Sequence, residues 1–151
     1  MQRFELVTPV PARPEDVFDL SLDVGAHTAS MSRSGERIVG GVRTGRMSLG
    51  DTVTWSARHF GVPWRMTSGI TALDRPVRFV DEQVRGPFRH WRHEHEFTWD
   101  AAAGVTEMRD VISFSAPFGI VGRVIERLVL RCYMERLIAE RNAHLAGRFR
   151  R

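Results

Sequence analysis

The sequence predicts an α+β domain with seven strands, two short helices after the first strand and one long C-terminal helix. Apolar and polar residues alternate with a period of two through most of residues 51–115, as in strands that have one buried face. Residues 119–147 contain no proline and keep helical spacing up to a closing glycine. Short connections between the alternating runs favour an antiparallel meander.

The N-terminal part of the chain supplies the first strand and both short helices. "QRFELVTPVP" is a β-like run that Pro9 and Pro11 end. In "ARPEDVFDLSLD", Pro14 stands where a first helical turn tolerates proline, and acidic residues follow it. "VGAHTASM" predicts a second short helix. The glycine-rich stretch after it predicts one strand near residues 38–42.

Five further strands follow, and turn-forming residues separate them. Glycine or proline stands in "GVP", "DRPV" and "RGPF", and glycine in "DAAAG". The predicted strands between these turns are "DTVTWSARHF", "WRMTSGITALD", "RFVDEQV", "HWRHEHEFTWD" and "VTEMRDVISFS".

The apolar face of the C-terminal helix changes direction along its length. In the first half it runs through Val121, Val124 and Leu128, and in the second through Met134 and Ile138. At 100° per residue these faces differ by about half a turn. Either the helix kinks near residue 130, or its halves bury against different partners. In the second case the displaced face makes a dimer or partner contact, so a homodimer is one expectation.

Composition narrows the class of protein. The 151 residues suit one domain spanning 1–151, with 42% hydrophobic and 26% charged residues. We see no apolar run of membrane-spanning length and no charged-then-apolar leader. The single Cys132 cannot form an internal disulfide, so we expect a cytoplasmic protein. All 22 cationic residues are arginines scattered among 18 acids, which argues against a nucleic-acid partner.

Two histidines occupy the centre of an otherwise aromatic strand face. In "RGPFRHWRHEHEFTWD", alternation places five residues on one side: Trp91, His93, His95, Phe97 and Trp99. The other side is polar, so the aromatic side is the inward one.

The neighbouring strands bring carboxylates to this inward face. The short "DAAAG" loop predicts that Asp110 lies opposite or diagonal to His95. The preceding strand has two possible registers: one turns Asp81 inward, and a one-residue slip turns Glu82 inward instead. Alternation also places His59 on the inward face. Because unpaired buried polar groups cost about 1–3 kcal/mol each, several together indicate a cavity with water or ligand atoms rather than a solid core.

The order of elements resembles the helix-grip fold of the START-related SRPBCC superfamily, in its polyketide cyclase/dehydrase-like bacterial branch. The resemblance covers nearly the whole chain. The stretches that carry it are "RMTSGITALDRPVRFVDEQVRGPFRHWRHEHEF", "TEMRDVISFSAPFG" and the region around Arg141.

This resemblance implies a curved seven-stranded antiparallel sheet wrapped around the long helix, with an elongated cavity between them. Members bind lipids, sterols, aromatic polyketides or other apolar ligands, and a minority catalyse cyclisation or dehydration. The superfamily has no shared catalytic constellation, so fold constrains function only weakly.

We therefore predict binding, for transport or sensing, of a small apolar or aromatic molecule. The alternatives are a cyclase, dehydratase or aromatase-like enzyme with catalytic candidates His93, His95 and Asp110, and an interaction module. A structural His–Asp hydrogen bond that only orders the sheet is a further interpretation. The predicted ligand-binding residues are Trp55, His59, Met66, Asp81, Trp91, His93, His95, Phe97, Met108 and Asp110.

We predict no cofactor and no metal. His-x-His on a strand can present two imidazoles to Zn²⁺, with His59 or Asp110 as a third ligand. Two potential ligands without a third at a recognisable spacing are only weak evidence for a metal site.

Overall fold

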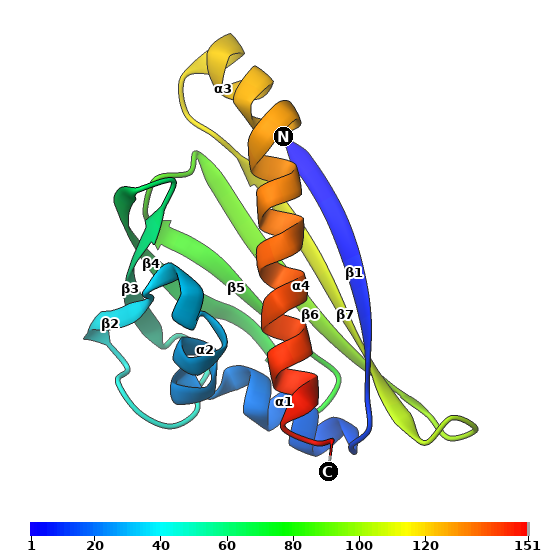
Figure 1. The fold of residues 1–151 in the computed structure, drawn as a ribbon. Coiled ribbons are helices and arrows are strands. Elements are labelled where there is room, and N and C mark those ends of the chain that lie inside the picture. The colour runs from blue at the N-terminus through cyan, green and yellow to red at the C-terminus, as the bar shows by residue number, and fades with distance from the viewer. Residues whose placement is uncertain (151) are drawn as a thin grey trace.

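A curved antiparallel sheet forms most of the molecule (Figure 1). The computed structural model describes residues 1–150. Its strand order is β1-β7-β6-β5-β4-β3-β2, so the first and last strands are neighbours. The strands are β1 (Gln2–Val10), β2 (Arg37–Gly41), β3 (Thr52–His59), β4 (Val62–Asp74), β5 (Arg78–Arg85), β6 (His90–Asp100) and β7 (Val105–Ser115). The seven predicted strands and their antiparallel arrangement are confirmed.

Local chemistry accounts for the tight turn between β6 and β7. The Asp100 side chain accepts hydrogen bonds from the backbone N–H groups of Ala102 and Ala103, at 3.0 and 3.1 Å. Gly104 then takes a positive φ of 67°, which glycine adopts without a steric cost. The turn sets a register in which His95 pairs with Asp110. Of the two positions predicted for Asp110, the directly opposite one is correct.

Two short helices cover one end of the concave face. They are α1 (Pro14–Leu22) and α2 (Val24–Ser30), and a 3₁₀ turn, η1 (Ser32–Ser34), follows them. The Asp23 carboxylate accepts a hydrogen bond from the Ala26 N–H at 2.8 Å and caps α2. Phe18 of α1 is fully buried, edge-on to Phe79 and Phe97 of the sheet.

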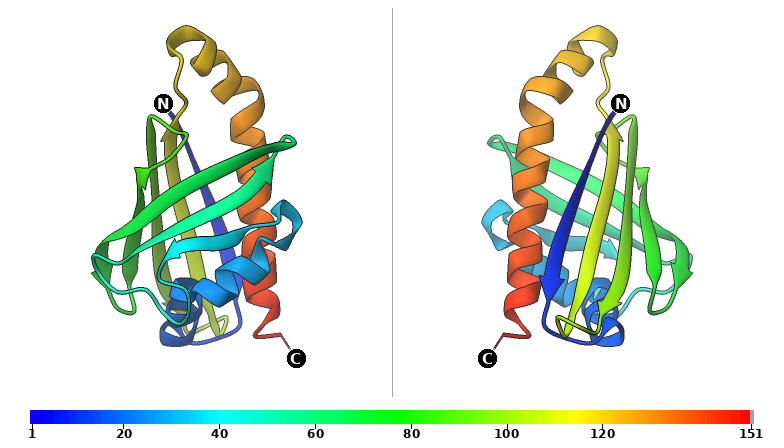
Figure 2. Two further views of the ribbon diagram at one scale, coloured as in Figure 1. Left: turned by 90° about the vertical axis from the view of Figure 1, so that its left-hand side faces the viewer. Right: turned by 90° about the vertical axis from the view of Figure 1, so that its right-hand side faces the viewer.

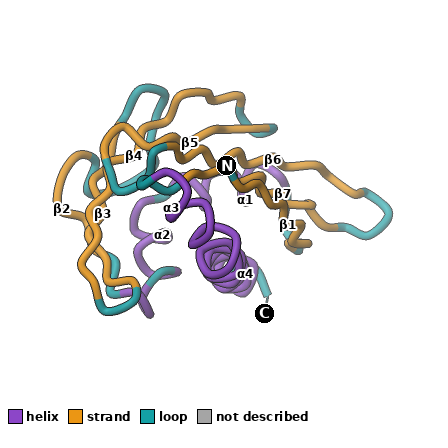
Figure 3. The backbone as a smooth tube through the Cα atoms, turned by 90° about the horizontal axis from the view of Figure 1, so that it is seen from above, coloured by secondary structure: helices purple, strands orange, loops and turns teal. Residues whose placement is uncertain are grey.

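The C-terminal helix lies across the concave face, and the sheet curves around it (Figures 2 and 3). It consists of α3 (Gly119–Ile125), a π-helical segment η2 (Glu126–Leu130) and α4 (Arg131–Gly147). The π-helical turn lies where the apolar face of the sequence changes direction. A wider turn rotates all later residues relative to earlier ones, which accounts for the change of direction near residue 130.

The apolar side of α4, together with Leu130 at the end of η2, packs on the sheet. Met134, Ile138 and Leu145 are buried. The first part of the helix extends past the end of the sheet (Figure 2), and its apolar side chains before Leu130 are exposed within residues 1–150. The exposed apolar side chains at this end are Phe118, Ile120, Val121, Val124, Ile125, Leu128 and Val129.

One buried carboxylate ties this projecting part to the sheet. Glu126 is 1% exposed, and its Oε1 accepts a hydrogen bond from the Ala116 backbone N–H just after β7. None of the described helices is long and apolar enough to cross a membrane.

Candidate functional site

A cavity of about 140 Å³ lies between the concave face of the sheet, α2 and α4, and is partly open to solvent. Its walls are mainly apolar and include Trp55, Trp64 and Trp91 from three strands and Ile138 from α4. A comparable cavity of about 150 Å³ lined by apolar side chains accepts benzene. The cavity therefore has room for at least one aromatic ring.

Seven of the ten predicted ligand-binding residues line this cavity. They are Trp55, His59, Met66, Asp81, Trp91, His93 and His95.

The other three predicted residues are buried outside the cavity wall. Phe97 and Met108 point to the concave side as expected, but α1 covers that end of the sheet, and Phe97 packs on Phe18 at 5.3 Å between ring centroids. Asp110 is fully buried behind the two histidine rings. It can act on a ligand only through neighbours that line the cavity, which are the two histidines and Arg141.

Asp110 is the most heavily bonded side chain of the cluster. Its Oδ1 accepts a 2.7 Å hydrogen bond from His93 Nε2, and its Oδ2 accepts one of 2.6 Å from the Asn142 side-chain amide. Arg141 brings a buried positive charge to 3.5 Å from the same Oδ1. The carboxylate is thus held by one strand and by α4.

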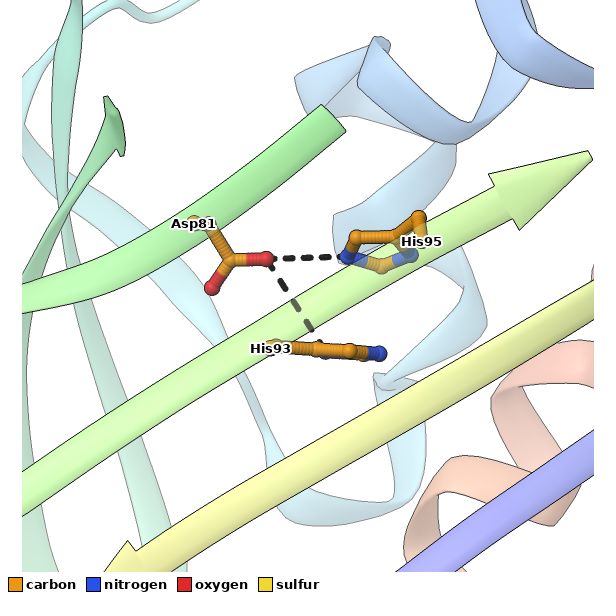
Figure 4. A group of neighbouring side chains, drawn as sticks. All are labelled: Asp81, His93 and His95. Carbon is orange, nitrogen blue, oxygen red and sulfur yellow. Dashed lines mark hydrogen bonds and ion pairs between the residues drawn. The ribbon is translucent and has the colours of Figure 1, made fainter. Parts of the chain in front are cut away.

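Asp81 and His95 complete the polar side of the cavity (Figure 4). Asp81 lies on β5 and turns inward, which resolves the two predicted registers in favour of the first. Its Oδ2 lies 2.9 Å from His95 Nε2 and 3.8 Å from His93 Nδ1. The two imidazole rings are stacked, with centroids 3.7 Å apart.

Burial and pairing set the charges of this cluster. Burial, together with the neighbouring His95, lowers the pKa of His93 to about 4. Burial alone would raise the pKa of Asp110, but hydrogen bonds from the histidines hold it well below its usual value. The pKa of Asp81 is lowered too, because its bond with His95 and the nearby imidazoles outweigh burial. Near pH 7 both carboxylates are therefore ionised and His93 is neutral.

The cluster contains one conflict of hydrogen bonding. His95 Nδ1 is buried without a hydrogen-bond partner of good geometry, and it lies 3.2 Å from Asp110 Oδ1. A neutral imidazole has one N–H and one lone pair. Whichever nitrogen of His95 carries the proton, the other directs its lone pair at a carboxylate oxygen.

A second polar pair lies on the α2 side of the cavity. His27 Nε2 is 2.7 Å from Glu36 Oε1, and the His27 ring packs on Trp55 in a tilted arrangement, with centroids 4.4 Å apart. Trp55 Nε1 donates to Ser68 Oγ at 3.3 Å. His27 and Glu36 could not be predicted as members of the site, because neither lies on a strand with a recognisable inward face.

Arg141 and Asn142 were also missed as members of the site. The signal for Arg141 was present in the sequence. Met134, Ile138, Arg141 and Leu145 follow helical spacing, so an arginine stands on the buried stripe of the helix. A charge there predicts a buried partner, which in the structure is Asp110.

One contact joins the cavity wall to the helix. His59 Nδ1 lies 2.6 Å from the Tyr133 hydroxyl oxygen, and Phe60 packs on the Tyr133 ring at 4.5 Å. Burial lowers the pKa of His59 and raises the pKa of Tyr133. Both groups are therefore neutral near pH 7, and one hydrogen bond links β3 to α4.

Comparison with solved structures agrees with this architecture. An aromatase/cyclase, ZhuI, from Streptomyces sp. R1128 superposes with a TM-score of 0.76 at 16% identity, covering 97% of this chain and 92% of that one. A START superfamily protein from Mycobacterium smegmatis gives 0.72 at 13% identity, covering 97% and 96%. Major latex-like protein 151 from Panax ginseng gives 0.71 at 11% identity, covering 99% and 98%. These likenesses show the helix-grip fold.

A search of curated proteins finds no match. The family model described as "Polyketide cyclase / dehydrase and lipid transport" matches residues 1–150. The chain therefore belongs to the polyketide cyclase/dehydrase and lipid transport family.

Proposed function

We propose that this protein binds a small, largely apolar or aromatic molecule in the cavity between the sheet and α4. The observation that carries the proposal is an apolar, tryptophan-rich cavity with a compact polar cluster on one side. Small-molecule sites commonly combine apolar walls, which supply most of the affinity, with a few polar groups that fix orientation. The family description, which includes lipid transport, supports the same class of ligand.

Native mass spectrometry of the freshly purified protein, compared with its denatured mass, is the first experiment. An organic mass that disappears on denaturation is the expected result, and it identifies the occupant. 1-Naphthol then serves as a defined probe, because quenching of Trp55 and Trp91 in the cavity wall reports its binding.

A matched pair of variants locates the bound probe. Ala57 lines the cavity on β3, and Ser56 is its neighbour on the other face of the strand. We expect Ala57→Phe to weaken 1-naphthol binding at least about tenfold by filling the cavity, and Ser56→Phe to leave it unchanged. Circular dichroism checks that both variants fold. Equal binding by both variants would place the probe elsewhere and overturn the proposal.

An enzymatic role is the second candidate, and the His93–Asp110 hydrogen bond favours it. Such a bond can orient an imidazole for acid–base catalysis of a cyclisation or dehydration. A pKa of about 4 makes His93 a weak proton acceptor near pH 7, and His95 lines the cavity beside it. Loss of turnover with retained binding in His95→Ala would support this role. If neither binding nor turnover changes, the His–Asp bonds serve the fold alone.

Cytoplasmic location and homodimer formation stay predictions. The exposed apolar residues of α3 and η2 are the surface through which a second copy would bind. Sedimentation velocity at low and high protein concentration tests for that dimer.

A further inference from the structure

The fold brings a third metal-binding side chain to the His-x-His pair of β6. Asp81 comes from the neighbouring strand, where its Cα pairs with that of His93. Asp81 Oδ2 lies 3.8 Å from His93 Nδ1 and 2.9 Å from His95 Nε2. One potential ligand atom from each of the three residues lies within 4.8 Å of the other two. Figure 4 shows the carboxylate facing both rings. Ligand atoms of a tetrahedral zinc site are about 3.3 Å apart, so small side-chain rotations would close the set.

We propose that Asp81, His93 and His95 bind one divalent transition-metal ion of the Zn²⁺ or Fe²⁺ class. Two imidazole nitrogens and one carboxylate oxygen suit these ions, and three protein ligands leave coordination positions open. The ligand residues line the cavity, so an open position faces it. Binding of a ligand oxygen at that open coordination position rests on the proposed function. Metal binding by the three side chains does not.

The hydrogen bonds of Asp110 support this assignment. Metal-binding histidines commonly donate their second N–H to a carboxylate, which sets the tautomer and the ring orientation. His93 does so through Nε2 at 2.7 Å from Asp110 Oδ1, which leaves the Nδ1 lone pair free toward Asp81. His95 Nδ1 lies 3.2 Å from the same oxygen. One fully buried carboxylate therefore serves both rings.

A metal ion would also resolve the hydrogen-bonding conflict at His95. With a cation between Nε2 and Asp81 Oδ2, the imidazole proton moves to Nδ1 and points at Asp110. The nitrogen that lacks a hydrogen-bond partner in the structure then carries a proton 3.2 Å from Asp110 Oδ1. A doubly protonated His95 between the two carboxylates would also remove the conflict. The experiment below distinguishes this protonated state from a bound metal ion.

Buried charge favours a cation as well. With neutral imidazoles, the cluster contains the charges of Asp81, Asp110 and Arg141, which sum to −1. A divalent ion brings the sum to +1, and an anionic ligand or hydroxide at an open position brings it to zero.

The test uses the full chain, stripped with EDTA and desalted, without any organic ligand. Co²⁺ is titrated in and followed by its visible absorption, and Zn²⁺ binding is measured by calorimetry. We expect one ion per chain, and loss of saturable binding in Asp81→Ala and His95→Ala. Asp110→Asn, which removes the charge behind both rings, should weaken binding about 10–100-fold.

His90→Ala is the matched control, since His90 lies on the same strand but bonds Ser113 on the other face. It should bind Zn²⁺ as the wild type does. If His90→Ala loses as much affinity as Asp81→Ala, or if folded wild-type protein binds no stoichiometric ion, the proposal is wrong. Circular dichroism establishes folding, and Asp81→Asn replaces Asp81→Ala if the latter unfolds.

Long-range ¹H–¹⁵N spectra of the imidazoles supply a readout at the named atoms. Zn²⁺ should shift His93 Nδ1 and His95 Nε2 and leave a single N–H on each ring. A His95 that keeps both protons in the presence of Zn²⁺ would overturn the assignment. Neither result depends on whether the cavity binds 1-naphthol.

Discussion

His95 and Asp110 face each other across the β6–β7 ladder, with Nδ1 of one 3.2 Å from Oδ1 of the other. Both are buried, at 2% and 0% exposure, so water screens their interaction only weakly. The short turn at Asp100 sets this register. A local turn thus places an acid next to the bases of the cavity wall.

Asp110→Asn should lower the free energy of unfolding by about 3–5 kcal/mol, because it leaves the buried Arg141 without its counter-charge. Urea denaturation measures the loss. Asp100→Asn is the control, because asparagine keeps the oxygen that accepts from the turn N–H groups. A cost for Asp110→Asn no larger than that for Asp100→Asn would show that Arg141 does not depend on the carboxylate.

Metal-free protein should lose stability as the pH falls from about 6.5 to about 4. The pKa of His93 is about 4 in the folded protein and about 6.5 in the unfolded chain. In this window the unfolded chain takes up a proton that the folded protein does not. Stability is therefore complete above pH 6.5 and declines by up to about 3 kcal/mol toward pH 4.

Thermal denaturation in EDTA across this pH range checks the slope. His93→Gln should flatten it, whereas His90→Gln on the outer face of the strand should not. The same slope in wild type and His93→Gln would assign the proton uptake to other groups.

Tyr133→Phe should lower the free energy of unfolding by about 0.5–1.5 kcal/mol, the usual net value of one hydrogen bond. The double variant His59→Asn/Tyr133→Phe should cost less than the sum of the single variants, because they remove the same bond. A double-mutant cycle in urea measures this coupling. Strictly additive losses would mean that the two groups do not interact in solution.

Glu126→Ala should cost about 1–3 kcal/mol, because it removes the acceptor of the Ala116 N–H. Glu126→Gln keeps an acceptor oxygen and should cost less. Hydrogen exchange at the Ala116 amide reports the same change, with faster exchange in the alanine variant. Equal exchange in both variants would contradict a role for the Glu126 oxygen.

Sequence patterns predicted most of the fold because buried and exposed residues alternate along β3 and most of β6. Trp55 and Met66 line the cavity, and Asp110 points inward, as their positions along the strands required. The register at Asp81 was not predictable, because β4 contains irregularities near residues 68 and 71 that shift its pairing with β5. Alternation predicts which face of a strand a residue occupies, but it does not predict where the pairing register with a neighbouring strand shifts.

The sequence pattern also could not predict which helix packs over each part of the sheet. Phe97 and His95 share one face of β6, yet only His95 reaches the cavity, because α1 covers Phe97. Asn142 bonds Asp110 across 32 positions of the chain, and no local spacing links them. Helix placement is a property of the folded chain as a whole.

The neighbouring positions of β1 and β7 have a consequence for how the chain folds. Gln2 pairs with Phe114, so the sheet cannot be completed until most of the chain has left the ribosome. Until β7 has been made, the β1 segment has no strand to pair with. Pairing over such sequence separations is slow, because a long loop must close first. We expect the β2–β6 meander to gain amide protection first on refolding and the β1–β7 ladder to gain it last.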